Sequence, residues 1–209
     1  MKKIFLIFLL AISSATLAQK IKILQGDINF LEGQTSLKTE FVYDNMIIGK
    51  NKGMKKPETE YRAEKKKTYN EKEPGRGDTW EQAWIADRQN RFEPQFRELF
   101  SEYSKISTVD EKAHYTLIFI TTMTEPGWDV GITRMPAFID AEVWIVETQN
   151  REHVMVKFLL TNAPGKTSGS MWALGLDSSN YEVGIRLQEA YAKSGKTLGK
   201  LITSKRGKS

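Results

Sequence analysis

Residues 113–160 decide the fold, and they read AHYTLIFITTMTEPGWDVGITRMPAFIDAEVWIVETQNREHVMVKFLL. Three runs in this stretch are rich in β-branched and aromatic residues, which favours strands at 115–124, 138–147 and 154–160. A loop with Gly, Pro and Trp separates the first two runs. Only a hairpin-length loop separates the last two, so we expect them to pair antiparallel.

Two helices are expected to flank this stretch. Aromatic residues recur at helical spacing over 79–105, where Asp78 is predicted to cap the helix and Pro94 to kink or split it. Trp80 and Trp84 share one face, which suits either sugar stacking or packing against the sheet, and we expect the packing. The second helix covers 179–203. Its glycines indicate a close approach to the sheet or a break near Gly195.

The residues before the first helix carry weaker signals. Residues 20–30 and 38–48 each resemble a strand, whereas 50–77 is a highly charged connector within which 61–72 forms either a helix or a loop. The whole pattern predicts an α+β fold in which a single mixed or antiparallel sheet of about four or five strands is packed by two long helices.

The N-terminus has the composition of a secretory signal peptide. Two lysines precede the apolar run 4–12, and small residues then lead to Ala18. The run is too short to span a bilayer, which takes about 20 residues. We therefore expect cleavage near Ala18, a single domain over 19–209 without a transmembrane segment, and a periplasmic or secreted location.

Composition excludes several kinds of function. The chain has no cysteine, which rules out thiol chemistry and zinc sites built from cysteine. Loss of Lys2 and Lys3 with the leader lowers the formal net charge from +5 to +3, a balance that does not favour nucleic acid. The sequence leaves the oligomeric state open.

The catalytic and cofactor motifs are weak. His114 and His153 both begin strands but lack the close spacing of a metal pair, and 165–167 lacks the upstream glycine of a phosphate-binding loop. Glu125, Asp129 and Asp140 are the acids from which a glycosidase pair would come. We assign no catalytic residue, and we expect no metal and no cofactor.

The loops that interrupt the strands offer better candidates for binding. Trp128 and Trp172 each lie in a connection that contains glycine, and Asp129 and Arg134 are close to the first in sequence. Tryptophan and arginine are favoured anchors of interfaces, so these four residues are the predicted binding site. The structural alternative is that each tryptophan folds back over the core.

The run YTLIFITTMTEPGW at 115–128 and the run AFIDAEVWIVE at 137–147, together with the order of elements, resemble small exported proteins of the Bacteroidetes type. Their domain is similar to the TolB N-terminal and penicillin-binding-protein-activator fold, an α+β sandwich of envelope assemblies. The resemblance covers roughly residues 38–203 and carries over no functional residue. The charged segment 50–72 and the absence of a lipid-anchor cysteine depart from the lipoprotein members.

These observations lead to two functional expectations. The first is an exported non-enzymatic domain that binds an envelope protein or a peptidoglycan-associated partner. The second is a carbohydrate-binding or carbohydrate-processing protein that uses the tryptophans and the nearby carboxylates.

Overall fold

Three long strands form the centre of the sheet in the computed structural model, which describes residues 19–49, 55–129, 134–165 and 181–206. They are β5 (Tyr115–Glu125), β8 (Phe138–Glu147) and β9 (Val154–Pro164). β8 pairs antiparallel with both neighbours, which confirms the pairing expected for the last two strands of the opening stretch.

Shorter strands complete a mixed sheet of seven. β1 (Lys20–Gly26) pairs antiparallel with β9 at one edge. At the other edge β2 (Lys38–Val42) and β3 (Ile47–Ile48) run parallel to β5, and β4 (Lys56–Pro57) lies against β3. A separate two-stranded ribbon consists of β6 (Trp128–Asp129) and β7 (Arg134–Met135).

The α+β class is confirmed, but four or five strands was too low a count. One strand was expected over 38–48, whereas a turn at Asn45, with φ of 59°, divides it into β2 and β3. β4 has only two residues, and one of them is Pro57, which cannot donate a hydrogen bond to a neighbouring strand. Its sequence therefore does not have the pattern of a strand.

The helix expected over 79–105 is present as a continuous helical run that begins three residues earlier. It comprises α2 (Arg76–Asp87), a π-helical segment η2 (Arg88–Phe92) and α3 (Glu93–Ser104). The π-helical segment ends two residues before Pro94, whose missing N–H interrupts the regular ladder of backbone hydrogen bonds. The capping role expected for Asp78 was wrong: it lies inside α2, where it accepts a hydrogen bond from Asn70 Nδ2 at 2.9 Å.

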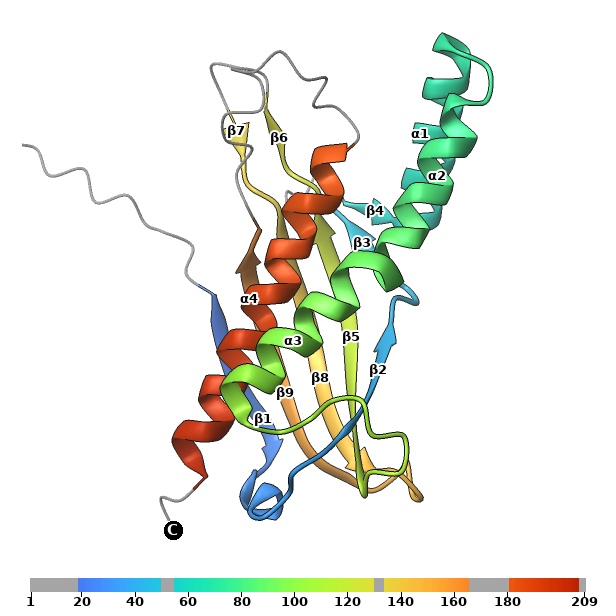
Figure 1. The fold of residues 1–209 in the computed structure, drawn as a ribbon. Coiled ribbons are helices and arrows are strands. Elements are labelled where there is room, and N and C mark those ends of the chain that lie inside the picture. Colours follow the sequence, from blue (N-terminus) through green and yellow to red (C-terminus); the bar gives the residue numbers. More distant parts are fainter. Residues whose placement is uncertain (1–18, 50–54, 130–133, 166–180, 207–209) are drawn as a thin grey trace, which may run out of the picture.

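The last helix, α4 (Tyr181–Lys205), is unbroken and packs with α3 on one face of the sheet (Figure 1). Two of its glycines, Gly195 and Gly199, approach α3 instead of the sheet. A Cβ built on Gly195 would lie 2.4 Å from the carbonyl oxygen of Phe96, and one on Gly199 would lie 2.9 Å from that of Phe100. Of the two alternatives, a break near Gly195 is absent, and the close approach is made to a helix and not to the sheet.

One hydrophobic core fills the space between this helix pair and the sheet. Phe96, Phe119 and Tyr191 are fully buried there, and the Tyr191 hydroxyl lies 2.7 Å from the hydroxyl of Thr121. On the opposite face of the sheet Lys157 Nζ lies 4.0 Å from the ring centroid of half-buried Trp144. Among the described residues, none of the helices combines the length and apolar character that a bilayer crossing needs.

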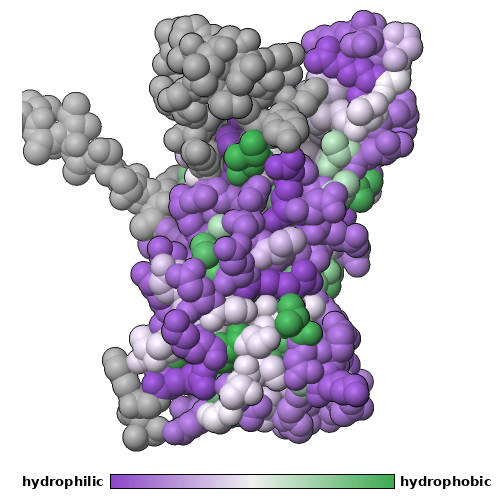
Figure 2. All heavy atoms as spheres, viewed as in Figure 1, coloured by the Kyte–Doolittle hydropathy of each residue, from purple (hydrophilic) through white to green (hydrophobic). Residues whose placement is uncertain are grey.

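The charged connector contains a helix, α1 (Glu58–Lys72), which lies antiparallel to α2. Arg62 Nη1 lies 2.9 Å from Glu81 near the base, and Lys66 Nζ lies 2.8 Å from Asp78 nearer the tip. We call this helix pair, residues 58–87, the helical arm. It extends beyond the sheet in Figure 1, and hydrophilic residues cover most of its outer end in Figure 2.

Candidate binding pocket beside the helical arm

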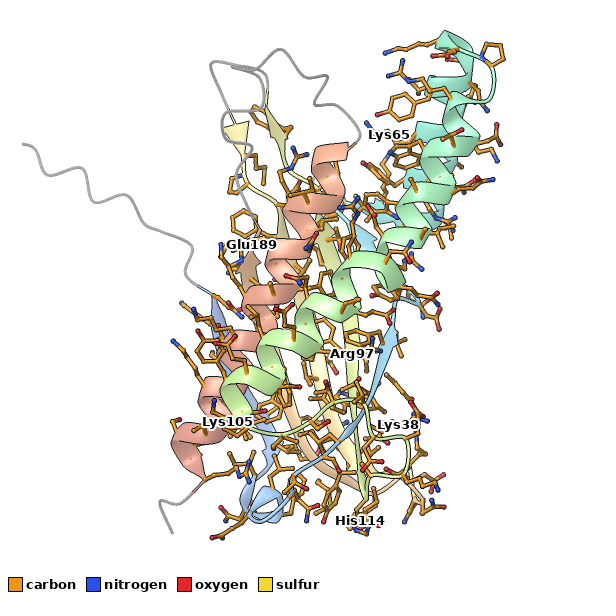
Figure 3. The ribbon with its side chains drawn as sticks, viewed as in Figure 1. Lys38, Lys65, Arg97, Lys105, His114 and Glu189 are labelled. Carbon is orange, nitrogen blue, oxygen red and sulfur yellow. The ribbon has the colours of Figure 1, made fainter. Side chains whose placement is uncertain are left out.

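Aromatic side chains hold the two helices of the arm together. The ring centroid of Trp80 lies 6.0 Å from that of Tyr61 and 5.7 Å from that of Tyr69. Lys65, labelled in Figure 3, lies over both tyrosine rings at 5.8 and 5.7 Å. Trp80 is only 8% exposed, so it does pack as expected, but against α1 instead of the sheet.

The base of the arm is fixed by a buried carboxylate, Glu58, which is 7% exposed. Its Oε1 accepts a hydrogen bond from Trp84 Nε1 at 2.7 Å and another from Arg88 Nη2. The guanidinium of Arg88 also lies over the ring of Tyr43, 4.5 Å from its centroid. Tyr43 directly follows β2. The arm is thereby joined to the sheet through charged and aromatic contacts.

A pocket of about 540 Å³ lies between the arm and the first turns of α4. Its apolar wall contains the indoles of Trp80 and Trp84, and its polar wall contains two cations and two carboxylates. Residues 73–76, 79, 80, 83, 84, 87, 91, 183 and 184 line it. Its size falls within the range of about 300–1,000 Å³ that is usual for ligand sites.

Asp87 and Arg91 form the polar wall on the α2 side. Arg91 Nε lies 2.6 Å from Asp87 Oδ1, one helical turn away. Burial raises the pKa of Asp87 above its ordinary value, and the charge of Arg91 opposes that rise. A Cβ built on Gly184 would lie 2.1 Å from Asp87 Oδ2, so a larger residue at position 184 would require this carboxylate to move.

Arg76 and Glu73 form the other polar pair of the pocket. Arg76 Nη1 lies 3.8 Å from Glu73 Oε2, and the Arg76 guanidinium lies 5.6 Å from the ring centroid of Tyr69. Each of the two pairs joins one positive and one negative side chain, so the wall carries no net charge from them. Such a lining orients polar groups of a ligand beside an apolar surface, an arrangement typical of a binding site.

Two of the three acids considered for a glycosidase pair, Glu125 and Asp140, have structural contacts in the chain. Glu125, 6% exposed, accepts a hydrogen bond from the Gly127 N–H at 3.1 Å and so braces the turn after β5. Asp140 accepts one from the Asn162 N–H at 2.7 Å, beside an irregularity in the pairing of β8 with β9. The side chain of Asp129 lies outside the described residues.

The predicted binding residues fall on the β6–β7 ribbon or outside the described ranges. Trp128 is 40% exposed on β6, and Asp129 pairs with Arg134 across the ribbon. The side chain of Arg134 and the whole of Trp172 lie outside the described residues. The backbone thus brings three of the four together, and their part in binding stays a prediction.

The two histidines lie near the β8–β9 hairpin. Thr148 N–H donates to the His114 carbonyl at 2.9 Å, and His153 Nδ1 lies 3.0 Å from Glu147 Oε1. Within the ranges that the structure describes, no group of three or more His, Asp or Glu side chains is arranged to hold a metal ion.

Sequence reasoning missed the pocket itself. The spacing of Asp87 and Arg91 is an ordinary i,i+4 ion pair, common on solvated helix faces. The better signal was Gly184, whose place within a helix indicated a close approach without naming the partner.

No protein-family model matches the chain, and no curated protein matches it. Among solved structures, the PelC dodecamer from Paraburkholderia phytofirmans is 8% identical, over 84% of this chain and 96% of that chain, at a TM-score of 0.34. Protein XCC0632 of Xanthomonas campestris, from the DUF330 family, is 12% identical, over 82% of this chain and 87% of that chain, at a TM-score of 0.37. Similarity at these TM-scores carries no argument about function, and the TolB-type resemblance stays a prediction.

Proposed function

We propose that this chain is exported and acts in the cell envelope as a non-enzymatic binding domain, with the pocket beside the helical arm as its binding site. The observation that carries the proposal is the pocket of about 540 Å³ between α2 and α4, with tryptophans on one wall and balanced ion pairs on the other. The export part rests on the leader-like sequence that ends at Ala18.

The lining favours recognition over chemistry. Each carboxylate of the pocket is paired with an arginine, Asp87 with Arg91 and Glu73 with Arg76. A general base needs a carboxylate that is free to take a proton from a substrate, and a paired carboxylate is poorly suited to that task. The pairs instead present charged donors and acceptors along the wall, and the Asp87–Arg91 pair is the closer of the two.

The partner that best fits these walls is a peptide segment of an envelope protein. An apolar side chain of the segment would lie against Trp84 and Val183, and its backbone would meet the charged pairs. Tryptophan and arginine are enriched at the energetic centres of protein interfaces, which supports a protein partner. The balanced charges of the wall favour neither a strongly acidic nor a strongly basic ligand.

Two alanines of α2 provide a matched test. Ala83 and Ala86 are both exposed, and only Ala83 lines the pocket. We expect an envelope protein captured by the wild-type chain to be retained by Ala86→Trp and lost with Ala83→Trp, because the new indole fills the pocket. Equal recovery of the same protein with both variants would contradict the proposed site.

Carbohydrate binding is a second candidate, favoured by the 40% exposure of Trp128 on the β6–β7 ribbon. An exposed indole offers a flat apolar face on which a sugar ring can stack. In a glycan-binding assay, loss of binding with Trp128→Ala and not with Ala83→Trp would favour this candidate over the peptide pocket.

A further inference from the structure

Gln19 directly precedes β1, and within the described ranges the oxygen of its side-chain amide is hydrogen-bonded whereas the nitrogen is not. The hydroxyl of Thr197, on α4, donates a hydrogen bond to Gln19 Oε1 at 3.1 Å. The other end of the amide, Nε2, is buried and has no hydrogen-bond partner among the residues that the structure describes. A buried donor without an acceptor is costly, and most such groups in folded proteins have a structural or chemical explanation.

The predicted cleavage after Ala18 would make Gln19 the first residue of the exported chain. Its α-amino group would then lie on the same residue as the orphaned amide. We propose that Gln19 is a modification site at which the N-terminus closes to pyroglutamate. This inference rests on the export part of the proposed function.

The reaction is balanced without an added reagent. The α-amino nitrogen attacks Cδ of its own side chain and forms a C–N bond, which closes a five-membered lactam. The Cδ–Nε2 bond breaks, and Nε2 leaves as ammonia with a proton that the amine gives up. No oxidant, reductant or second substrate takes part, and the oxygen that Thr197 contacts is kept as the lactam carbonyl.

The environment of Gln19 favours this product. The atom that leaves makes no hydrogen bond within the described part of the chain, so its departure breaks none there. The hydroxyl of Thr197 draws electron density from Cδ through Oε1, which assists attack at that carbon.

Cyclisation also removes the positive charge of the N-terminus. Lys20 and Lys22 follow on β1, and Lys196 and Lys200 lie within about one helical turn of Thr197 on α4. A free α-ammonium group would add to these like charges.

Intact-mass analysis of the full chain, produced with its leader and recovered from the exporting cell, tests the proposal. We expect a chain that begins at Gln19, is about 17 Da lighter than the unmodified sequence and resists stepwise N-terminal sequencing. The Gln19→Ser variant has no side-chain amide at this position and is expected to keep a free amine. A processed chain that keeps the Gln19 amide, or that begins at another residue, overturns the inference while export stands. A chain that retains its leader overturns the export proposal first.

The role of Thr197 is tested on the rate of ammonia loss after Gln19 is exposed. Thr197→Val keeps the shape of the side chain and removes the donor, so we expect the reaction to be about three- to tenfold slower. Thr197→Ser keeps the hydroxyl and is expected to react at about the wild-type rate. Equal rates in all three chains would overturn the part assigned to Thr197.

Discussion

Trp84 Nε1 donates a hydrogen bond to Glu58 Oε1 over 2.7 Å, which joins the start of α1 to the end of α2. The same oxygen accepts a hydrogen bond from Arg88 in the π-helical segment. One buried carboxylate therefore sets the position of the arm and, with it, one wall of the pocket.

Replacing Glu58 by alanine is expected to lower the free energy of unfolding by about 1–3 kcal/mol, because the partly buried guanidinium of Arg88 and the indole N–H of Trp84 lose their acceptor. Urea unfolding measures this change, and hydrogen exchange over 58–72 is expected to increase. The control is Glu60→Ala, which removes an exposed carboxylate of the same helix. A loss no larger than that of the control would contradict the anchoring role.

The contact between α3 and α4 predicts a large effect at Gly195. Gly195→Ala places a Cβ 2.4 Å from the carbonyl oxygen of Phe96, so the helices must move apart at an expected cost of about 1–3 kcal/mol. Lys193→Ala, at a more exposed position of the same helix, is expected to change stability by about 0.5 kcal/mol or less. Thermal and urea unfolding of both variants check the difference.

Asp87 and Gly184 are expected to be energetically coupled. Gly184→Ala forces its new Cβ against Asp87 Oδ2, and Asp87→Ala removes the obstructing carboxylate. In a double-mutant cycle the combined variant is therefore expected to lose less stability than the two single losses added together, by about 1 kcal/mol or more. Strict additivity would mean that the two residues are not in contact in solution.

Glu93 predicts a pH dependence of stability. Burial raises the pKa of Glu93 above its ordinary value of 4.5, against the opposing charge of Arg97. Between 4.5 and the raised pKa the folded chain binds more protons than the unfolded chain, so this group makes the protein less stable as pH rises. Compared with Glu93→Gln, the wild-type chain is expected to lose stability as pH rises above 4.5.

Glu40 supplies the control of opposite sign. Its hydrogen bond with Arg151 lowers the pKa of Glu40, so the stabilisation that it provides is lost as pH falls through that lowered pKa. The urea midpoints of unfolding of the wild-type chain, Glu93→Gln and Glu40→Gln, measured from about pH 3 to about pH 7, distinguish the two pH dependences. For each variant, the stability difference from wild type changes with pH. If this change had the same sign for Glu93→Gln and Glu40→Gln, it would contradict the claim that burial raises the pKa of Glu93.

The long strands and helices could be predicted because their signals are local. Alternation along 138–147 and 154–160 identified two strands and their antiparallel pairing. The recurring aromatics over 79–105 identified a helix whose buried face includes Phe96 and Phe100. Hydrophobic periodicity is a strong signal in long segments because it is repeated at every turn of a helix and at every second residue of a strand.

The arm and its pocket depend on contacts that no local pattern records. Tyr61 and Tyr69 look isolated among charges, and their partner Trp80 lies on the other helix of the hairpin. The glycines of α4 indicated a close neighbour but did not distinguish a helix from the sheet. The start of α2 was missed because Gly75, with φ of 84°, turns the chain just before Arg76.

Site-specific photo-crosslinking in intact exporting cells tests the central claim most directly. A small diazirine amino acid in place of Thr79 lines the pocket without filling it, and the same group at position 86 is the exposed control on the same helix. We predict a discrete adduct with an envelope protein from position 79 and none from position 86. Adducts of equal yield from both positions, or none from either, would contradict the claim that this pocket binds a protein partner in the envelope.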